Sequence, residues 1–435
     1  MALIRKQTLK NFFSAQWLDS SDFFKHIFSR KRFFQLFWGI HISPPNPSSS
    51  SGTQSRSAKL RNVLDYVGAN FLKYYRPSQN LSADESTVPF KGRVACKMYA
   101  SNKPVKWGIR VYDVADAATG YILSMIPYYG PELKETLCHP VHSFTTRIIF
   151  QLIDNITSVI KESGYHVFTD RLYTSIELAQ ELFNRKMHLT GTLNTNRKGL
   201  PIQFKKGKPK MQQFQVQSLV KASRYHVLVW KDKRYVFMLS TKHDDKVHQH
   251  RRFNKRGQEE LISKPNMIAD YTAHMGGVDR ADHYISSYQF LQRSVKWWRK
   301  LYFFVLESSV VNSFILFNMH MKNLDDHNAT LDHRSFRKVL IYQLVAKVRN
   351  PTFSRFGHIS TIDHEARLDG KLHIIDHRPY SRDCIVCSDR GGPGGRKETV
   401  YYCDTCPRKP GLHPKECFRV YHTKQQYKKK VQVID

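Results

Sequence analysis

Two aspartates stand one helical turn apart in the segment 275–282, which reads MGGVDRAD. Asp279 and Asp282 follow a Gly-Gly pair, in a chain whose 69 Lys and Arg and 36 Asp and Glu give a formal net charge of +33. Carboxylate oxygens are the ligands that Mg²⁺ prefers in proteins. A carboxylate pair in so basic a chain favours a metal ion held where a polyanion binds. The structural alternative is an aspartate in the first turn of a helix, where the helix dipole favours it.

Two further aspartates lie where strands are expected. Asp84 lies in LSADES, at the start of the first predicted α/β strand, and Asp170 ends the run YHVFTD just before a predicted helix. Strand-end carboxylates in an α/β sheet project into the crevice where ligands bind. Together with Asp279 they could hold a pair of Mg²⁺ ions, which activate the attacking oxygen and stabilise the leaving oxygen in a displacement at phosphorus. For each aspartate alone, a capping or turn role is the alternative.

Five of the seven cysteines lie between Cys384 and Cys417. Two C-x-x-C pairs separated by 15 residues are typical of tetrahedral zinc sites. Three further candidate ligands follow, and His373 or His377 could supply an eighth. The candidate zinc ligands are Cys384, Cys387, Cys403, Cys406, His413, Cys417 and His422. The sequence leaves open whether they bind one zinc ion or two.

Basic residues that could bind DNA are concentrated at two places outside these clusters. A polar turn follows a predicted strand, and a second group combines charges with an indole. Lys and Arg contact phosphates, and an indole can stack on an unpaired base. A solvated charged surface and a tryptophan packed in the core are the alternatives. The candidate DNA-binding residues are Asn194, Asn196, Arg197, Lys198, Arg293, Lys296 and Trp298.

The net charge favours a phosphate-rich partner with salt-dependent binding, with an anionic membrane surface as the competing partner. The longest apolar stretch, residues 301–318, contains Glu307, Asn312 and three serines. These polar residues favour a buried helix over a membrane span, so we expect no membrane partner. The amino terminus does not resemble a secretory signal.

The elements that must position these residues follow from hydrophobic periodicity. Residues 107–130 predict a hairpin with its turn near 116–120, residues 145–163 a helix that ends at Gly164, and residues 165–170 a short strand. A helix near 176–183 and a strand at 188–193 follow. This is an α/β order with a mixed sheet. Two further β runs, 225–230 and 234–240, lie in a polar insertion, and residues 267–348 are predicted to be helical.

Several ordered segments resemble piggyBac-type transposases and the piggyBac-derived proteins of the group numbered four. The blocks that carry the resemblance are NLSADESTVPFKGR (80–93), KMYASNKPVKWGIRVY (97–112), VFTDRLYTSIELAQEL (167–182), GTLNTNRKGLP (191–201), MGGVDRAD (275–282) and RSVKWWRKLYFFVLESSVVNSFILF (293–317). They occur in the family's order and span most of residues 58–345. Two departures are Ala83, where the family often has a larger aliphatic residue, and a shorter amino-terminal region.

The resemblance implies an RNase H-like catalytic core in which Asp84, Asp170 and Asp279 bind Mg²⁺, or Mn²⁺ in its place, with Asp282 close to the metal site. It implies cut-and-paste transposition in the nucleus by a homodimer that binds transposon ends and a TTAA target. Water hydrolyses one strand, the freed 3′-OH attacks the opposite strand to form a hairpin, and the reopened 3′-OH attacks the target. A catalytically silent DNA-binding protein that retains the fold and the zinc module is the alternative.

The expected fold class is multidomain α/β, in which the RNase H-like core carries a β-containing insertion, a flanking helical DNA-binding and dimerisation region, and a small C-terminal zinc domain. The resemblance assigns the turn at 194–198 to the start of the insertion, and the cysteine-rich domain to DNA at the element ends. The expected boundaries are a helical region at 1–80 with a linker at 44–57, the core at 81–193 and 267–282, the insertion at 194–266, the second helical part at 283–348, a linker at 349–380, the zinc domain at 381–425 and a basic tail at 426–435.

Overall fold

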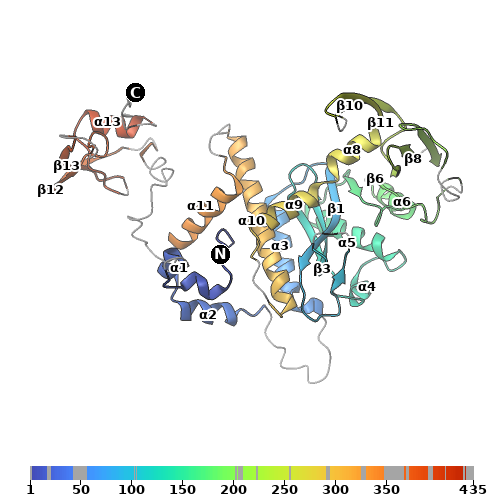
Figure 1. Cartoon of the computed structure of the whole chain (residues 1–435), viewed down its shortest axis with the longest axis horizontal. Coiled ribbons are helices and arrows are strands. Elements are labelled where there is room, and N and C mark those ends of the chain that lie inside the picture. Colours follow the sequence, from blue (N-terminus) through green and yellow to red (C-terminus); the bar gives the residue numbers. More distant parts are fainter. Residues whose placement is uncertain are drawn as a thin grey trace, which may run out of the picture. The chain divides into compact units, whose positions relative to one another are not determined.

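Figure 1 shows the computed structural model of the chain, which divides into two compact units, Met1–Arg349 and Asn350–Asp435. Each unit has a hydrophobic core of its own. The structure describes residues 2–16, 21–42, 56–101, 103, 105–200, 203, 209–221, 224–253, 256–290, 294–324, 330–346, 367–368, 372–389, 395–406, 408–424 and 427.

A sheet of mixed direction forms the centre of the first unit. β1 pairs antiparallel with β3, which also pairs with β2 and β4, whereas β1–β5 and β5–β6 are parallel pairs. The predicted fold class, with its mixed-sheet core, is confirmed. The strands are β1 (Asn80–Pro89), β2 (Met98–Tyr99), β3 (Trp107–Asp116), β4 (Ile122–Pro127), β5 (His166–Thr169) and β6 (His188–Thr192).

The predicted insertion extends this same sheet. Beyond β6 the order continues β9, β8, β7, and two more strands form a separate hairpin. β10, with the sequence VHQHRRF, is almost entirely exposed and has no apolar face, so periodicity could not predict it. The insertion strands are β7 (Val216–Lys221), β8 (Tyr225–Lys231), β9 (Tyr235–Ser240), β10 (Val247–Phe253) and β11 (Glu259–Pro265).

Helices pack against both the parallel and the antiparallel parts of the sheet. α3 and α5 contact β4, α6 contacts β6, and α9 contacts β1 and β3. α5 ends at Ile160 rather than at the predicted Gly164, because Lys161 adopts a left-handed conformation with φ 57°. These helices are α3 (Arg61–Tyr74), α4 (Glu132–Thr136), α5 (Phe144–Ile160), α6 (Ile176–Asn184), α8 (Asn266–His274), α9 (Gly277–Ser287), α10 (Trp297–Asn323) and α11 (His333–Ala346).

The amino-terminal segment forms short helices held together by phenylalanines. Phe12, Phe24 and Phe37 are buried with one another, and Phe37 stacks against Phe303 of α10. Most of the predicted linker at 44–57 lies outside the described residues. The short helices are η1 (Leu9–Phe13), α1 (Asp22–Ile27), α2 (Arg30–Gly39) and η3 (Arg56–Lys59).

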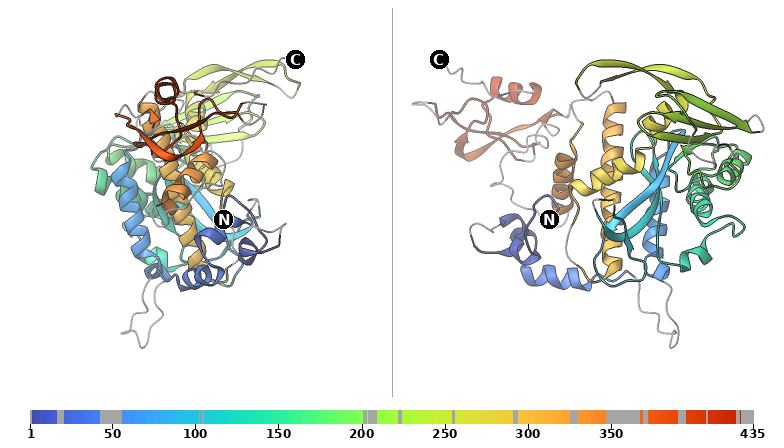
Figure 2. Two further views of the ribbon diagram at one scale, coloured as in Figure 1. Left: turned by 90° about the vertical axis from the view of Figure 1, so that its left-hand side faces the viewer. Right: turned by 45° about the vertical axis from the view of Figure 1, so that its right-hand side comes forward.

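α10 is the long central helix of the first unit and runs along α3 in both views of Figure 2. It is long and apolar enough to cross a membrane, by length and composition only. Its polar residues, however, have partners inside the protein. The Asn312 amide donates to the Ile122 carbonyl oxygen at 2.8 Å and accepts from the Ile122 N–H at 2.9 Å, and Glu307 pairs with Arg337 of α11 at 2.7 Å. α10 therefore packs as the core helix that the sequence predicts.

The second unit contains a two-stranded sheet, β12 (Ile375–Asp383) and β13 (Glu398–Cys403), and the helix α13 (Glu416–Thr423). β12 begins inside the stretch 349–380 that was predicted to be a linker. The linker is therefore shorter at its carboxyl end, because residues from Ile375 onward pair with β13. The buried Arg367 donates to the carbonyl oxygens of Tyr421 and Lys424, which holds Arg367 to the end of α13.

Candidate active site and zinc module

β1 and β5 bring Asp84 and Asp170 to neighbouring positions. The two strands are parallel, with Ala83 opposite Thr169, so Asp84 and Asp170 are the next residues in register. β5 ends there, and the chain turns sharply: the Asp170 carboxylate accepts from the Leu172 N–H at 2.8 Å. The predicted placement of Asp170 at a strand end agrees with the structure, whereas Asp84 lies inside β1, which continues along β3.

The Gly-Gly pair brings α9 against β1. A Cβ on Gly277 would lie 2.9 Å from the Ser82 Cβ and 3.0 Å from the Asp116 carbonyl oxygen, so only glycine fits there. The Ser82 hydroxyl donates to the Met275 carbonyl oxygen. Side chains at alternate positions share one face of a strand, so Asp84 lies on the same face of β1 as Ser82. This is the face against which the first turn of α9, with Asp279, is held.

Burial shapes the electrostatics of this acidic group. It raises the pKa of Asp84 to about 9, an effect to which Glu85 and the charge of Asp170 add. It also raises the pKa of Asp170, against the hydrogen bond from Leu172. The pKa of Asp282 rises to about 6 through burial, opposed by Ser86 and Lys103 and supported by the charge of Asp279. A divalent cation would relieve this mutual repulsion, so the donors have the chemistry of a Mg²⁺ site.

Asp113 is an acidic neighbour that the sequence did not single out. It lies directly opposite Asp84 in the β1–β3 ladder, where facing side chains share one side of the sheet. The residue is completely buried, and burial raises its pKa to about 8, with the charge of Asp282 adding to the shift. A hairpin pattern predicted β3, but the pairing register that aligns Asp113 with Asp84 cannot be read from spacing alone.

Tyr271 of α8 lies close enough to the three predicted ligands for their charges to affect its pKa. Burial raises its pKa to about 12, against a hydrogen bond with Thr192 that lowers it, and the charges of Asp170, Asp84 and Asp279 each raise it further. All three carboxylates therefore act on one hydroxyl, although they come from β1, the end of β5 and α9. Sequence reasoning also missed this residue, since one tyrosine in a helix carries no distinguishing signal.

The three predicted carboxylates lie on elements that pack together, but they do not form a closed set of ligands. Three groups of Cys, His and acidic side chains in the described part of the chain have ligand atoms within 4.8 Å of one another, and the predicted Asp84–Asp170–Asp279 set is not among them. Mg²⁺ commonly keeps several waters and takes further oxygens from substrate phosphates. The arrangement is therefore compatible with ions that water and DNA would help to coordinate.

The polar turn after β6 lies beside the Asp170 loop. Arg197 donates to the carbonyl oxygens of Arg171 and Leu172, so its guanidinium holds this loop. Asn194, Asn196 and Lys198 are exposed. Three of the four residues predicted to bind DNA here are thus on the surface near a candidate metal ligand, and Arg197 has a positioning contact that the sequence did not suggest.

The second predicted DNA-binding group is divided by the structure. Lys296 is exposed, whereas Arg293 lies outside the described residues. Trp298 is only 8% exposed and belongs to the main hydrophobic core. The prediction that Trp298 contacts DNA is corrected, because a buried indole has no free surface on which a base could stack. The tryptophan packs instead at the start of α10, beneath the cation of Lys59.

The second unit gathers all seven predicted zinc ligands, with His373 as the eighth. One set is Cys384, Cys387, His413 and Cys417, and the other is His373, Cys403, Cys406 and His422. Sulfur–nitrogen separations are 3.4 Å for Cys387–His413 and 3.6 Å for Cys403–His373. Tetrahedral zinc with ordinary Zn–S and Zn–N bonds requires about 3.6 Å. The geometry fits two closed four-ligand sites, with ligands interleaved along the chain.

Comparison with known proteins identifies the family. The model of the family described as Transposase IS4 matches residues 1–314. The chain belongs to this transposase family. A second model, described as a DDE_Tnp_1-like zinc finger, matches residues 369–423 and supports Zn²⁺ as the ion of the C-terminal unit.

Named relatives place the chain among piggyBac-like transposases. The human PiggyBac transposable element-derived protein 3 is 25% identical over 401 residues, which are 91% of this chain and 63% of that protein. The human PiggyBac transposable element-derived protein 2 is 24% identical over 419 residues, 93% of this chain and 66% of that protein. This transposase thus spans slightly less than two thirds of each relative's length.

A solved structure shares the fold. The cryo-EM structure of a piggyBac transposase synaptic complex with hairpin DNA matches with a TM-score of 0.65 and 21% identity, covering 82% of this chain and 71% of that one. The resemblance to piggyBac-type transposases seen in the sequence is confirmed.

Proposed function

We propose that this piggyBac-like transposase cleaves and joins DNA strands at a divalent-metal site formed by Asp84, Asp170 and Asp279. The observation that carries the proposal is the packing of β5 and α9 against β1. Asp84 and Asp170 are neighbours in register, and Gly277 holds the first turn of α9, with Asp279, against β1. Residues 84, 170 and 279 lie on separate elements, and a structural capping role for each would not require them to share one environment. The net charge of the chain is +33, and three carboxylates gathered in so basic a chain, of which Asp84 and Asp170 are partly buried, favour a bound cation and a polyanionic substrate.

Mg²⁺, or Mn²⁺ in its place, would supply an activated attacking oxygen and charge neutralisation at the scissile phosphate. The protein's own residues supply the positions. The Leu172 N–H orients the Asp170 carboxylate, Gly277 lets α9 approach β1, and Asp282 lies one turn beyond Asp279 with Ser86 beside it. Exposed cations such as Lys198 and Lys296 would hold the DNA backbone, giving affinity without sequence information.

The proposed course is cut-and-paste transposition. Water hydrolyses one strand at the element end and frees a 3′-OH. This 3′-OH attacks the opposite strand, which forms a hairpin on the element end and releases the 3′-OH of the flanking DNA. Water then opens the hairpin, and the regenerated 3′-OH attacks a TTAA target and displaces a 3′-OH of the target strand. We propose that a homodimer carries out these steps in the nucleus and that the zinc module binds element-end DNA. Supporting these points are the family membership and the sequence blocks shared with piggyBac-type transposases.

A second candidate is a DNA-binding protein that retains the fold without strand transfer. It is favoured by the named relatives, whose names describe them as transposable element-derived proteins. The two candidates differ in one respect: only the enzyme needs the carboxylates for its effect on DNA.

An excision assay separates the candidates. The substrate is a plasmid in which the element's own ends flank a reporter. The wild-type chain is expected to excise the flanked segment from the plasmid, and Asp279→Asn should reduce this excision by at least about a hundredfold. Asp65→Asn, an exposed aspartate on α3, is the matched control and leaves excision unchanged. DNA binding, measured at fixed salt, persists in both variants. Binding without excision in the wild-type chain would establish the silent protein, and excision by Asp279→Asn would refute the three-aspartate site.

A further inference from the structure

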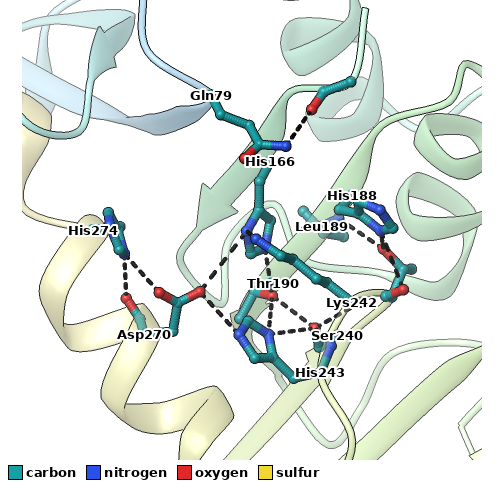
Figure 3. A network of polar contacts seen from close by, with 12 residues as sticks. Gln79, His166, His188, Leu189, Thr190, Ser240, Lys242, His243, Asp270 and His274 are labelled. Carbon is teal, nitrogen blue, oxygen red and sulfur yellow. Dashed lines mark hydrogen bonds and ion pairs between the residues drawn. The ribbon is translucent and has the colours of Figure 1, made fainter.

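A second kind of metal-ligand cluster lies in the first unit and contains no cysteine. Its members are His166 on β5, His243 in the turn after β9, and Asp270 on α8, and their ligand atoms lie within 4.8 Å of one another. Figure 3 shows the three side chains directed toward a common point, with His274 on the far side of Asp270. β5 belongs to the core, β9 to the insertion, and α8 follows the insertion in the chain. The three residues are therefore far apart in the sequence, and no local motif predicts the cluster.

The distances suit a small transition-metal ion. The Asp270 Oδ2 atom lies 2.9 Å from His243 Nε2 and 3.8 Å from His166 Nδ1. Ligands at ordinary Zn–N and Zn–O bond lengths in a tetrahedron are separated by roughly 3.3 Å. The two measured separations lie on either side of this value, so small side-chain shifts would bring all three atoms onto one ion.

In both imidazoles, the ring nitrogen that faces away from Asp270 has a hydroxyl partner. His166 Nε2 lies 2.8 Å from the Thr190 hydroxyl, and His243 Nδ1 lies 3.1 Å from the Ser240 hydroxyl. Ligating histidines almost always use the second ring nitrogen in this way, which orients the ring and leaves the facing nitrogen to bind metal. His166 is completely buried, and a buried imidazole is kept neutral by the cost of desolvating its charged form.

We propose that His166, His243 and Asp270 bind a zinc ion, with a water molecule in the fourth position. Two imidazoles and one carboxylate are a donor set that Zn²⁺ accepts readily. The ion joins β5, at whose far end Asp170 follows, to α8, which leads into α9 and Asp279. It therefore fixes the spacing between two carboxylates of the proposed active site without touching DNA.

Lys242 competes with the metal. Its amine lies 3.5 Å from His166 Nδ1, on the same nitrogen that would bind zinc. The side chain is otherwise exposed, so it can move away when the ion enters. Removing this positive charge should strengthen zinc binding on the order of tenfold, a modest effect because an exposed ammonium is screened by solvent.

Zinc content after thiol modification tests the proposal in the full chain. A mercurial reagent releases zinc held by cysteine thiolates and leaves a His–His–Asp site intact. The wild-type chain is expected to retain about one zinc ion per chain, whereas His243→Gln and Asp270→Asn retain none. His250→Gln, an exposed histidine on β10, is the control for adventitious imidazole binding and matches the wild type.

A second measurement does not depend on variants of the ligands. Lys242→Met replaces an exposed residue. The chelator concentration that removes half of the thiol-independent zinc should be about tenfold higher for this variant than for the wild type. Wild-type protein that retains no zinc after thiol modification would overturn the proposal and leave the cluster as a hydrogen-bonded histidine network. Retained zinc that survives Asp270→Asn would also overturn it, since the ion would then lie elsewhere.

Discussion

Replacing Asp113 with asparagine should stabilise the first unit, by an amount that grows with pH. Asp113 is completely buried, and burial raises its pKa from 3.8 to about 8. The unfolded chain therefore releases this proton near pH 4, while the folded chain holds it to about pH 8. Stability from this group is fully present below the lower pKa and is lost as pH rises through the higher one. Asparagine resembles the protonated acid and does not titrate.

The size of the effect follows from the shift. One pKa unit corresponds to about 1.4 kcal/mol, so at pH 7, roughly three units above the ordinary value, the wild type has lost at most about 4 kcal/mol. This value is an upper limit, and we expect Asp113→Asn to gain about 2 kcal/mol at pH 7. The gain should shrink toward zero near pH 4.

Thermal unfolding of the full chain from pH 4 to pH 8 measures this difference, by following the transition of the first unit. Asp116→Asn is the matched contrast on the same strand and is equally buried. Its carboxylate accepts hydrogen bonds from the N–H groups of Ser78, Ala118 and Thr119 at 2.7–3.0 Å. Asp116→Asn should therefore destabilise the unit by about 2 kcal/mol or more. A stabilisation by Asp113→Asn that does not change with pH would refute the reasoning.

Three other predictions test the site and the scaffold. Mg²⁺ or Mn²⁺ at ten times its dissociation constant should stabilise the wild type by about 1.4 kcal/mol, and Asp84→Asn should abolish the shift in unfolding midpoint; an equal shift in both proteins would place the ion elsewhere. Glu307→Ala leaves the 7%-exposed Arg337 unpaired and should cost about 3–5 kcal/mol in chemical denaturation, whereas an exposed pair would cost under about 1 kcal/mol. Cys403→Ser should lower bound zinc by about one ion per chain and expose the second unit to proteolysis while the first resists; unchanged zinc would contradict the ligand assignment.

The strands and helices around the candidate site could be predicted because burial imposes a pattern on the sequence. The hairpin of β3 and β4 and the helix α5 have apolar residues at the periods of their elements, and these residues form the core. The zinc ligands could be predicted because the two cysteines of a C-x-x-C pair are close enough along the chain to bind the same ion. The choice between His373 and His377 could not be made, since it depends on where β12 begins.

Other parts of the site depend on contacts between distant residues. Asp113 belongs to the acidic group only through its register with Asp84, and Trp298 is buried because it packs into the main hydrophobic core. The guanidinium of Arg197 has the composition of a DNA-binding residue, yet it is used to hold the Asp170 loop. Residue type gives the available chemistry in each case, and tertiary structure decides how it is used.

The contact between Asn312 and Ile122 has a consequence for synthesis of the chain on the ribosome. The asparagine satisfies both backbone groups of a residue that lies 190 positions earlier. At a translation rate of about 5–20 residues per second, Asn312 is synthesised roughly 10–40 s after Ile122. Until then, the N–H and the carbonyl oxygen of Ile122 lack their Asn312 partner, and the apolar surface that α10 covers is exposed. Chaperones would have to shield that surface, and fragments that stop before α10 should aggregate rather than fold.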